Sequence, residues 1–288
     1  MAWSLYRWVW QVEAPLHIGM APAGMLNRTR LYVPSRALWG ALTAELARLG
    51  AQGFPEYEKV GAELREKTRL GYLYPAKAVN GQWMAWLPRY AECGVGLVWK
   101  REDGRAEDRR AKGEGERKFR MRLLITRPGT AIEPESASAA EGTLREFELI
   151  SPYWRGDGTL FQRVALVGYI FCKDAAPELK PIQTLWVGGD ARYGLGRLER
   201  VAWKPADSFF GEPVDLQGKE PVVKTSRVLA HTYVSTGGAS LVGAMERLGG
   251  WDMPKGGLTI QELTWVPGSV SKNPQDFVIQ EDGLWRMR

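Results

Sequence analysis

The chain has 288 residues, enough to bury a large core, and its 44% hydrophobic and 25% charged residues are typical of a globular protein. Its 39 Lys and Arg against 33 Asp and Glu give a net charge of +6, which permits a polyanionic partner without requiring one. Two distant cysteines exclude a disulfide framework or zinc cluster, and without a signal peptide or long apolar run we expect a cytoplasmic protein with no membrane span.

The N-terminal part of the chain predicts a strand followed by two helices. Apolar and polar residues alternate over residues 3–13, which favours a strand. A loop rich in Pro and Gly follows, and Ser35 then occupies the position of an N-cap. The helix predicted over residues 36–50 places four leucines on one face, and residues 55–70 predict a second helix of mixed charge.

The middle of the chain predicts a charged insertion among strands. Residues 100–122 hold ten Lys and Arg, six Asp and Glu and very few apolar residues. This composition predicts a flexible excursion, the loop of a long hairpin. Strands are predicted at the end of this excursion and beyond it, over residues 121–126, 142–150 and 162–172.

A glycine-rich segment follows a short helix predicted over residues 177–186. Its four glycines lie within nine residues, at Gly188, Gly189, Gly194 and Gly196, before a strand predicted over residues 195–203. The segment lacks the ending of a P-loop, and it leads into a strand, whereas the dinucleotide fingerprint opens a helix. Two interpretations stay open: a tight connection, or a loop that holds nucleic-acid phosphates through its N–H groups, Arg192 and Arg197.

The predicted order of elements is β-α-β-β-α-β. This order is typical of a ferredoxin-like (RRM-like) core of the α+β class, an antiparallel sheet with helices on one face. We expect the core and its long inserted hairpin to occupy residues 1–204. Residues 205–288 then form a C-terminal extension of short strands and Gly-rich turns, or a partial second domain.

Four stretches, in order, resemble the RAMP superfamily, the RNA-binding subunits of CRISPR effector complexes. GGDARYGLGR resembles the signature glycine loop of the family, and LHIGMAPAG…LYVPSRALWGAL resembles its strand–loop–helix start. RPGTAIEPESASAAEGTLREFELI resembles the central hairpin segment of type III subunits, and QRVALVGYIF fits the strand before the second helix. The resemblance covers roughly residues 8–204 and leaves the last 84 residues unmatched.

The resemblance implies a structural subunit of a type III-like complex in antiviral defence. Such a subunit grips guide RNA, contacts other CRISPR effector subunits, meets target RNA indirectly, and needs no cofactor, metal or membrane. The basic excursion lies where such subunits carry a thumb-like hairpin. The implied RNA-binding residues lie in the glycine loop, at the preceding turn and around the start of the first helix: Gly188, Gly189, Arg192, Tyr193, Gly194, Gly196, Arg197, His17, Arg28, Arg30, Ser35 and Arg36.

Catalysis is not expected from this resemblance. Slicing relatives have an aspartate in the loop before the first helix, whereas residues 20–34 contain no Asp or Glu. Relatives that process guide RNA usually have the glycine loop near the C-terminus, whereas 92 residues follow Gly196 here. One alternative is a metal-independent endoribonuclease that uses His17 or His231, and another is a protein-interaction module without RNA. The place of such a subunit in the complex also stays open. It is either a repeated subunit of the backbone or the single subunit that caps the 5′ handle of the guide RNA.

Overall fold

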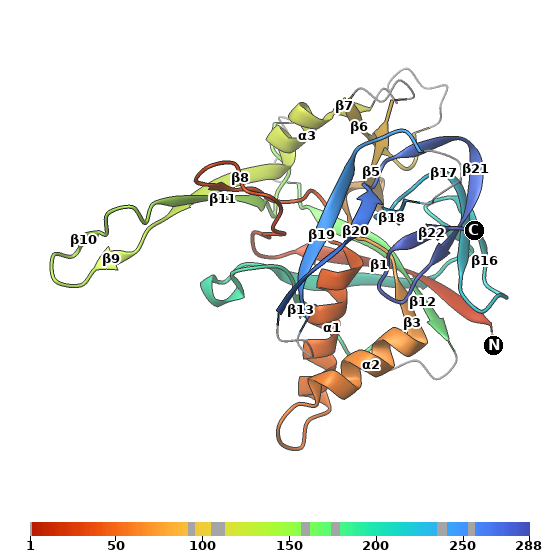
Figure 1. Ribbon diagram of the computed structural model, residues 1–288, viewed down its shortest axis with the longest axis horizontal. Coiled ribbons are helices and arrows are strands. Elements are labelled where there is room, and N and C mark those ends of the chain that lie inside the picture. The colour runs from red at the N-terminus through yellow and green to blue at the C-terminus, as the bar shows by residue number, and fades with distance from the viewer. Residues whose placement is uncertain are drawn as a thin grey trace.

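The computed structural model describes residues 2–91, 96–104, 113–156, 162–173, 179–234, 241–252 and 257–288. This part of the chain forms two large sheets, three helices and a projecting arm (Figure 1). Strands predominate, and the mixture of strands and helices agrees with the α+β class expected from the sequence.

The first large sheet is built around the first strand of the chain. β1 pairs antiparallel with β12 and with β14, and β12 pairs antiparallel with β3 and β4. The strands predicted over residues 3–13, 162–172 and 195–203 are thereby confirmed. Within the described residues this sheet has nine strands, in the order β13 (Thr184–Trp186), β14 (Arg197–Pro205), β1 (Trp3–Val12), β12 (Ala165–Lys173), β4 (Tyr74–Val79), β5 (Gln82–Tyr90), β6 (Leu97–Arg101) and β7 (Glu114–Gly115), with β3 (Thr68–Leu70) also beside β12.

The two helices predicted near the N-terminus are confirmed as α1 (Ser35–Leu49) and α2 (Tyr57–Lys67). The N-cap of α1 is Pro34 rather than Ser35, because Ser35 already has helical geometry. Leu38 and Leu42 are fully buried, as their spacing predicted, whereas Leu49 is exposed at the last turn.

The basic excursion predicted over residues 100–122 contains a helix that its composition did not predict. Residues 105–112 lie outside the described residues, and β7 and α3 (Glu116–Leu123) follow them. Phe119 of α3 stacks on Trp99, with 4.5 Å between ring centroids and 8° between ring planes. Both rings are buried, so they anchor α3 on the first sheet.

The helix predicted over residues 177–186 is wrong for its described part. Residues 174–178 lie outside the described residues, and residues 184–186 form β13. The buried Leu185 pairs with Leu198 across β13 and β14, so sheet pairing determines the local conformation.

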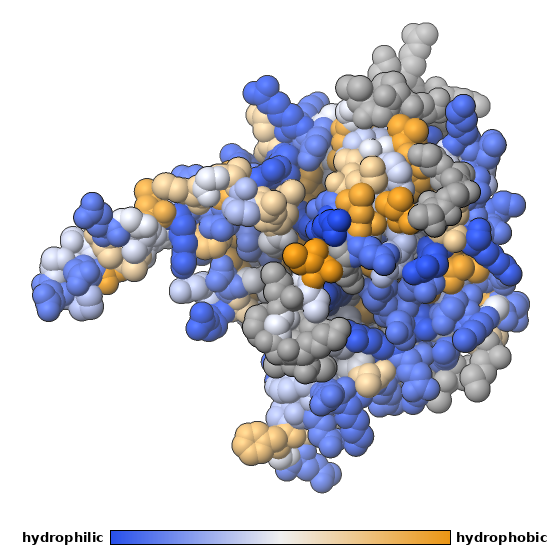
Figure 2. All heavy atoms as spheres, in the orientation of Figure 1, coloured by the Kyte–Doolittle hydropathy of each residue, from blue (hydrophilic) through white to orange (hydrophobic). Residues whose placement is uncertain are grey.

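The C-terminal residues form a second large sheet. Phe209, Phe277 and Trp285 of this sheet are fully buried and belong to one continuous core with β1 and β12. Apolar side chains also gather on its outer surface over β19 and β20 (Figure 2). The eight strands within the described residues lie in the order β15 (Ser208–Phe209), β16 (Glu212–Asp215), β17 (Val222–Arg227), β21 (Val270–Ile279), β22 (Trp285–Met287), β18 (Thr232–Tyr233), β20 (Gly257–Trp265) and β19 (Met245–Asp252).

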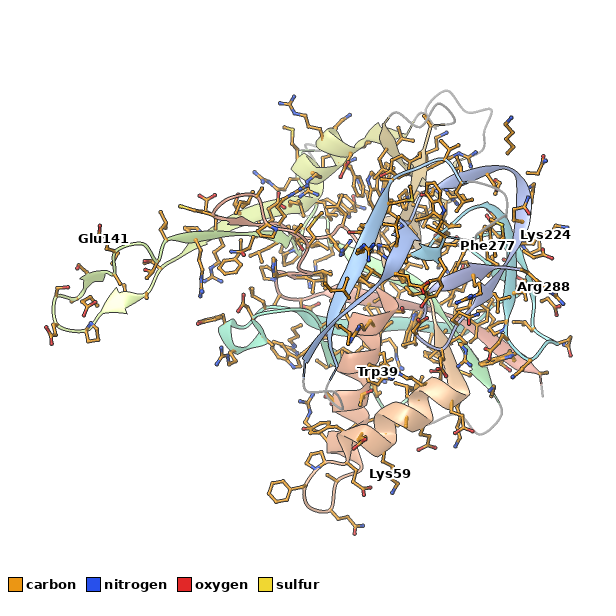
Figure 3. All side chains as sticks on the ribbon, viewed as in Figure 1. Trp39, Lys59, Glu141, Lys224, Phe277 and Arg288 are labelled. Carbon is orange, nitrogen blue, oxygen red and sulfur yellow. The ribbon has the colours of Figure 1, made fainter. Side chains whose placement is uncertain are left out.

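A long arm projects from the body (Figure 1). Its root is β8 (Leu124–Gly129) and β11 (Arg145–Ile150), with β2 (Leu26–Asn27) beside β11, and its tip is β9 (Ile132–Glu133) and β10 (Ser138–Ala139). Glu141, near the tip, lies far from the body (Figure 3). The strands predicted over residues 121–126 and 142–150 therefore belong to the arm and not to the core sheet, and residues 121–123 are helical. None of the described helices is long and apolar enough to cross a membrane.

Candidate nucleic-acid interface

The glycine-rich segment forms a closed loop between β13 and β14. The N–H of Val187 donates a hydrogen bond of 2.9 Å to the carbonyl oxygen of Gly196, which joins the two ends of the loop. Gly196 has φ +83°, and a Cβ there would overlap the carbonyl oxygen of Val187. Glycine is therefore needed where the backbone of the loop closes on itself.

The same loop packs against the turn that carries His17. The N–H of Gly189 donates to the carbonyl oxygen of His17 at 2.9 Å, and a Cβ at Gly188 would overlap that oxygen. The N–H of Gly196 donates to the carbonyl oxygen of Pro15, also at 2.9 Å. These bonds offset part of the entropy cost of ordering the loop. The close approach at Gly188 and Gly196 is thus made by the protein's own backbone.

The tip of the glycine loop presents side chains to solvent. Residues Ala191–Tyr193 form a single 3₁₀ turn between Asp190 and Gly194, both of which have positive φ. Arg192 is exposed, and Tyr193 is 62% exposed. Arg197, at the end of the loop, is paired with Glu199 at 2.5 Å. A guanidinium for phosphate and a phenol ring for base stacking suit single-stranded nucleic acid.

His17 joins the glycine loop to the arm. Its Nδ1 lies 2.9 Å from the carbonyl oxygen of Glu148 on β11, and its ring packs edge-on against Phe147 with 5.7 Å between centroids. Because a carbonyl oxygen only accepts, Nδ1 carries a proton and Nε2 is the nitrogen without a hydrogen in the neutral ring. His17 is buried, so packing and this hydrogen bond are its observed contacts.

The root of the arm adds three residues that the sequence analysis did not identify. Arg145 and Phe147 lie on one face of β11, and Arg127 of β8 is opposite Phe147 in the register. The guanidinium of Arg145 lies 5.2 Å from the ring centroid of Phe147. Arg127 and Arg145 are exposed, and Figure 1 shows the loop after β13 on the same side of the body as the arm. The alternation of REFELI could have indicated this face, but only the register adds Arg127.

The residues predicted around the start of α1 separate into two groups. Arg28 is half-buried next to β2, beside the root of the arm. The hydroxyl of the buried Ser35 donates to the carbonyl oxygen of Asp282 at 3.2 Å. The guanidinium of Arg36 lies directly against Gly250 of β19. The second sheet therefore covers the start of α1, which the resemblance placed beside RNA.

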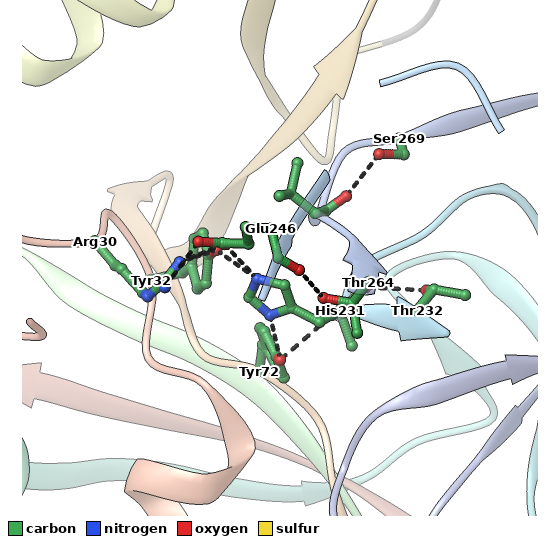
Figure 4. A network of polar contacts seen from close by, with 10 residues as sticks. Arg30, Tyr32, Tyr72, His231, Thr232, Glu246, Thr264 and Ser269 are labelled. Atoms are coloured by element: carbon green, nitrogen blue, oxygen red, sulfur yellow. Dashed lines mark hydrogen bonds and ion pairs between the residues drawn. The ribbon is translucent and has the colours of Figure 1, made fainter. Parts of the chain in front are cut away.

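Arg30 and His231 meet in a largely buried polar network around Glu246 (Figure 4). Arg30 donates two hydrogen bonds to Glu246, at 2.6 and 3.0 Å, and Nε2 of His231 lies 2.6 Å from the same carboxylate. The hydroxyl of Tyr72 lies 2.7 Å from Nδ1 of His231. Nε2–H therefore donates to Glu246 while Nδ1 accepts from Tyr72, and every polar atom of the ring has a partner.

The network leaves His231 neutral and Glu246 ionised. Burial lowers the pKa of His231, although the adjacent Glu246 opposes this effect. Burial alone would raise the pKa of Glu246, but hydrogen bonds from His231 and Arg30 outweigh it and lower that pKa to about 2. His231 is fully buried, so its contacts are structural. The described residues contain no group of three or more His, Cys, Asp and Glu that could hold a metal ion.

Comparisons with known proteins show which solved structures have a similar architecture. No protein family model and no curated protein matches the sequence. A chain in the solved structure of the Type III-B Cmr-beta bound to cognate target RNA superposes with a TM-score of 0.58 and 11% identity, over 98% of each chain. The chain shares the fold of a Type III-B Cmr-beta chain.

A second solved structure gives the same result. In the Type III-B Cmr-beta bound to cognate target RNA and AMPPnP, a chain superposes with a TM-score of 0.57 and 12% identity, over 92% of this chain and 85% of that chain. The resemblance expected from the sequence is confirmed at the level of the fold. The similarity to the Cmr-beta chains also extends into the C-terminal residues that the sequence motifs left unmatched.

Proposed function

We propose that this chain is a non-catalytic subunit of a type III-like CRISPR effector complex and that it binds guide RNA. The observation that carries the proposal is the superposition on a Type III-B Cmr-beta chain over 98% of both chains. A fold shared along nearly the whole length is consistent with a shared place in an assembly, and the basic and aromatic residues described above supply the chemistry.

The arrangement of the core strands supports a ferredoxin-like core within this fold. β14, β1, β12 and β3 lie side by side and each neighbouring pair is antiparallel. In chain order these are the fourth, first, third and second strands, the order that a β-α-β-β-α-β core requires. α1 and α2 connect the first two of them, and the segment from β12 to β14 contains β13 and the glycine loop.

The RNA-binding surface that we propose runs from the tip of the glycine loop to the root of the arm. Arg192, Arg127 and Arg145 are exposed cations for phosphates, and Tyr193 and Phe147 are rings for bases. His17 holds the two parts together through its bonds to the loop and to β11. Of the RNA-binding residues predicted from the sequence, Arg30 and Ser35 have protein partners and are not included.

The test is a titration of labelled guide RNA with the full-length chain at several salt concentrations. Replacing Arg127, Arg145 and Arg192 by Ala should weaken binding of all sequences and reduce the slope of log K against log salt by about two, at roughly 0.7 per phosphate contact. A Lys59→Ala and Lys224→Ala double variant removes cations elsewhere (Figure 3) and should keep the slope. If the wild-type chain binds no RNA, the proposal fails and the protein-interaction alternative is favoured.

A further inference from the structure

The second sheet ends in a strand with one partner. β19 is at the end of the strand order and pairs antiparallel with β20. The described residues supply no strand on its other side. An open edge exposes a row of main-chain N–H and C=O groups that another strand can pair with.

The register identifies the groups that point to this edge. The N–H of Val266 donates to the carbonyl oxygen of Ala244 at 3.0 Å, so these two residues are hydrogen-bonded partners. Hydrogen-bonded and non-hydrogen-bonded pairs alternate in an antiparallel ladder. Met245 and Arg247, opposite Trp265 and Leu263, therefore belong to non-hydrogen-bonded pairs. Their own N–H and C=O groups point away from β20, toward the open edge.

The outer face of the same ribbon is apolar. Met245, Ile260 and Leu263 are 48%, 66% and 39% exposed, and the exposed Arg247 lies opposite Leu263. The inner face is held in place, because Glu246 belongs to the buried network and Gly250 lies against Arg36. β19 contains no proline and one irregularity in its register, between Arg247 and Gly249, so little protects its first half from pairing.

We propose that β19 binds an extended strand of a neighbouring protein subunit, which adds to the sheet beside Met245 and Arg247. The ladder supplies main-chain hydrogen bonds, and the apolar outer face packs against alternate side chains of the added strand. An acidic side chain on that strand pairs with Arg247. RNA does not fit this surface, because RNA has no main-chain N–H and C=O groups to pair with the open edge and because the face is mainly apolar. The inference concerns a protein contact and does not depend on guide-RNA binding.

The test compares two substitutions at one position in the full-length, tagged chain purified from its native cells with the subunits bound to it. Arg247→Pro removes an outward N–H and no bond of the β19–β20 ladder, whereas Arg247→Ala removes the charge and keeps the N–H. Arg247→Pro should lower the ratio of partner subunits to tagged chain at least about tenfold, and Arg247→Ala less than about threefold. In the wild type, the amides of Met245 and Arg247 should exchange with solvent at least about tenfold more slowly in the assembly than in the isolated chain.

A further variant keeps the proposal testable if Arg247→Pro does not fold. Leu263→Lys charges the outer face from β20 without altering the backbone, and it should reduce the partner ratio as Arg247→Pro does. Circular dichroism of each isolated variant checks that it folds. If Arg247→Pro is unfolded, the partner ratio of Leu263→Lys tests the proposal. The proposal is overturned if amide exchange is equal in the assembly and the isolated chain. It is also overturned if neither Arg247→Pro nor Leu263→Lys changes the partner ratio. Protection removed by ribonuclease assigns the edge to RNA instead, and a homodimer of the isolated chain that Arg247→Pro dissociates assigns it to a second copy.

Discussion

Nδ1 of His17 lies 2.9 Å from the carbonyl oxygen of Glu148, although 131 positions separate the two residues in the chain. The same histidine accepts a hydrogen bond from Gly189 through its own carbonyl oxygen. One buried residue thus fixes the glycine loop and the arm relative to each other. The proposed RNA-binding surface depends on that fixed relation, because its cations come from both parts.

Replacing His17 by Ala should lower the free energy of unfolding by about 1–3 kcal/mol, because the substitution removes a buried hydrogen bond and the ring packed on Phe147. His17→Asn places an N–H donor near the position of Nδ1 and should recover part of this loss. Urea denaturation of the three proteins measures both effects. Equal losses in the two variants would show that the bond to Glu148 contributes nothing.

The glycines of the loop should differ in their tolerance of alanine. Gly194→Ala meets only the penalty of a positive φ, about 1–2 kcal/mol, since nothing lies within 4 Å of its Cβ position. Gly188→Ala and Gly196→Ala add a clash with the backbone and should lose at least about 3 kcal/mol each. Urea denaturation tests this ranking, and three equal losses would contradict the close approach described above.

Stability should fall in acid through the Glu246 network. The pKa of Glu246 is lowered from 4.5 to about 2 in the folded protein, so its contribution is present above pH 4.5 and is lost as the pH falls through 2. At 1.36 kcal/mol per pKa unit, the shift corresponds to about 3 kcal/mol. The pKa of His231 is also lowered from 6.5, so protonation of the unfolded chain removes further stability below pH 6.5.

Glu246→Gln isolates the carboxylate part of this effect. The unfolding free energy of the variant should be lower at pH 7 and should vary less between pH 4.5 and pH 2 than that of the wild type. Glu199→Gln removes an exposed carboxylate paired with Arg197 and serves as the control. Parallel pH profiles for the wild type and Glu246→Gln would exclude the proposed role of this carboxylate.

We expect no cleavage of RNA by the purified chain. Residues 20–34 contain no carboxylate, His231 is fully buried, and His17 is buried with its ring packed against Phe147. A general acid–base group contributes about 10²–10⁴ in rate, so its absence should leave cleavage near background. Incubation with repeat RNA and with a guide-matched target, with and without magnesium, measures this. Specific cleavage that is abolished in a folded His17→Ala or His231→Ala variant would establish the endoribonuclease instead.

Local patterns in the sequence correctly predicted several separate elements. Alternation predicted β1, the leucine spacing predicted α1, and the apolar run predicted β12. Each of these signals depends on residues within one element. The glycine loop was also located, but the close approach of Gly188 and Gly196 to the protein's own backbone was not predicted.

The sequence by itself determined the class of fold, the positions of β1, α1 and β12, and the resemblance that the solved structures support. Tertiary structure alone decided which residues are available to a ligand. Arg30 is paired with Glu246, Ser35 is covered by Asp282, and Arg145 joins Arg127 at the root of the arm. All of these outcomes depend on contacts between segments distant in the chain, and periodicity carries no information on which distant segments pair.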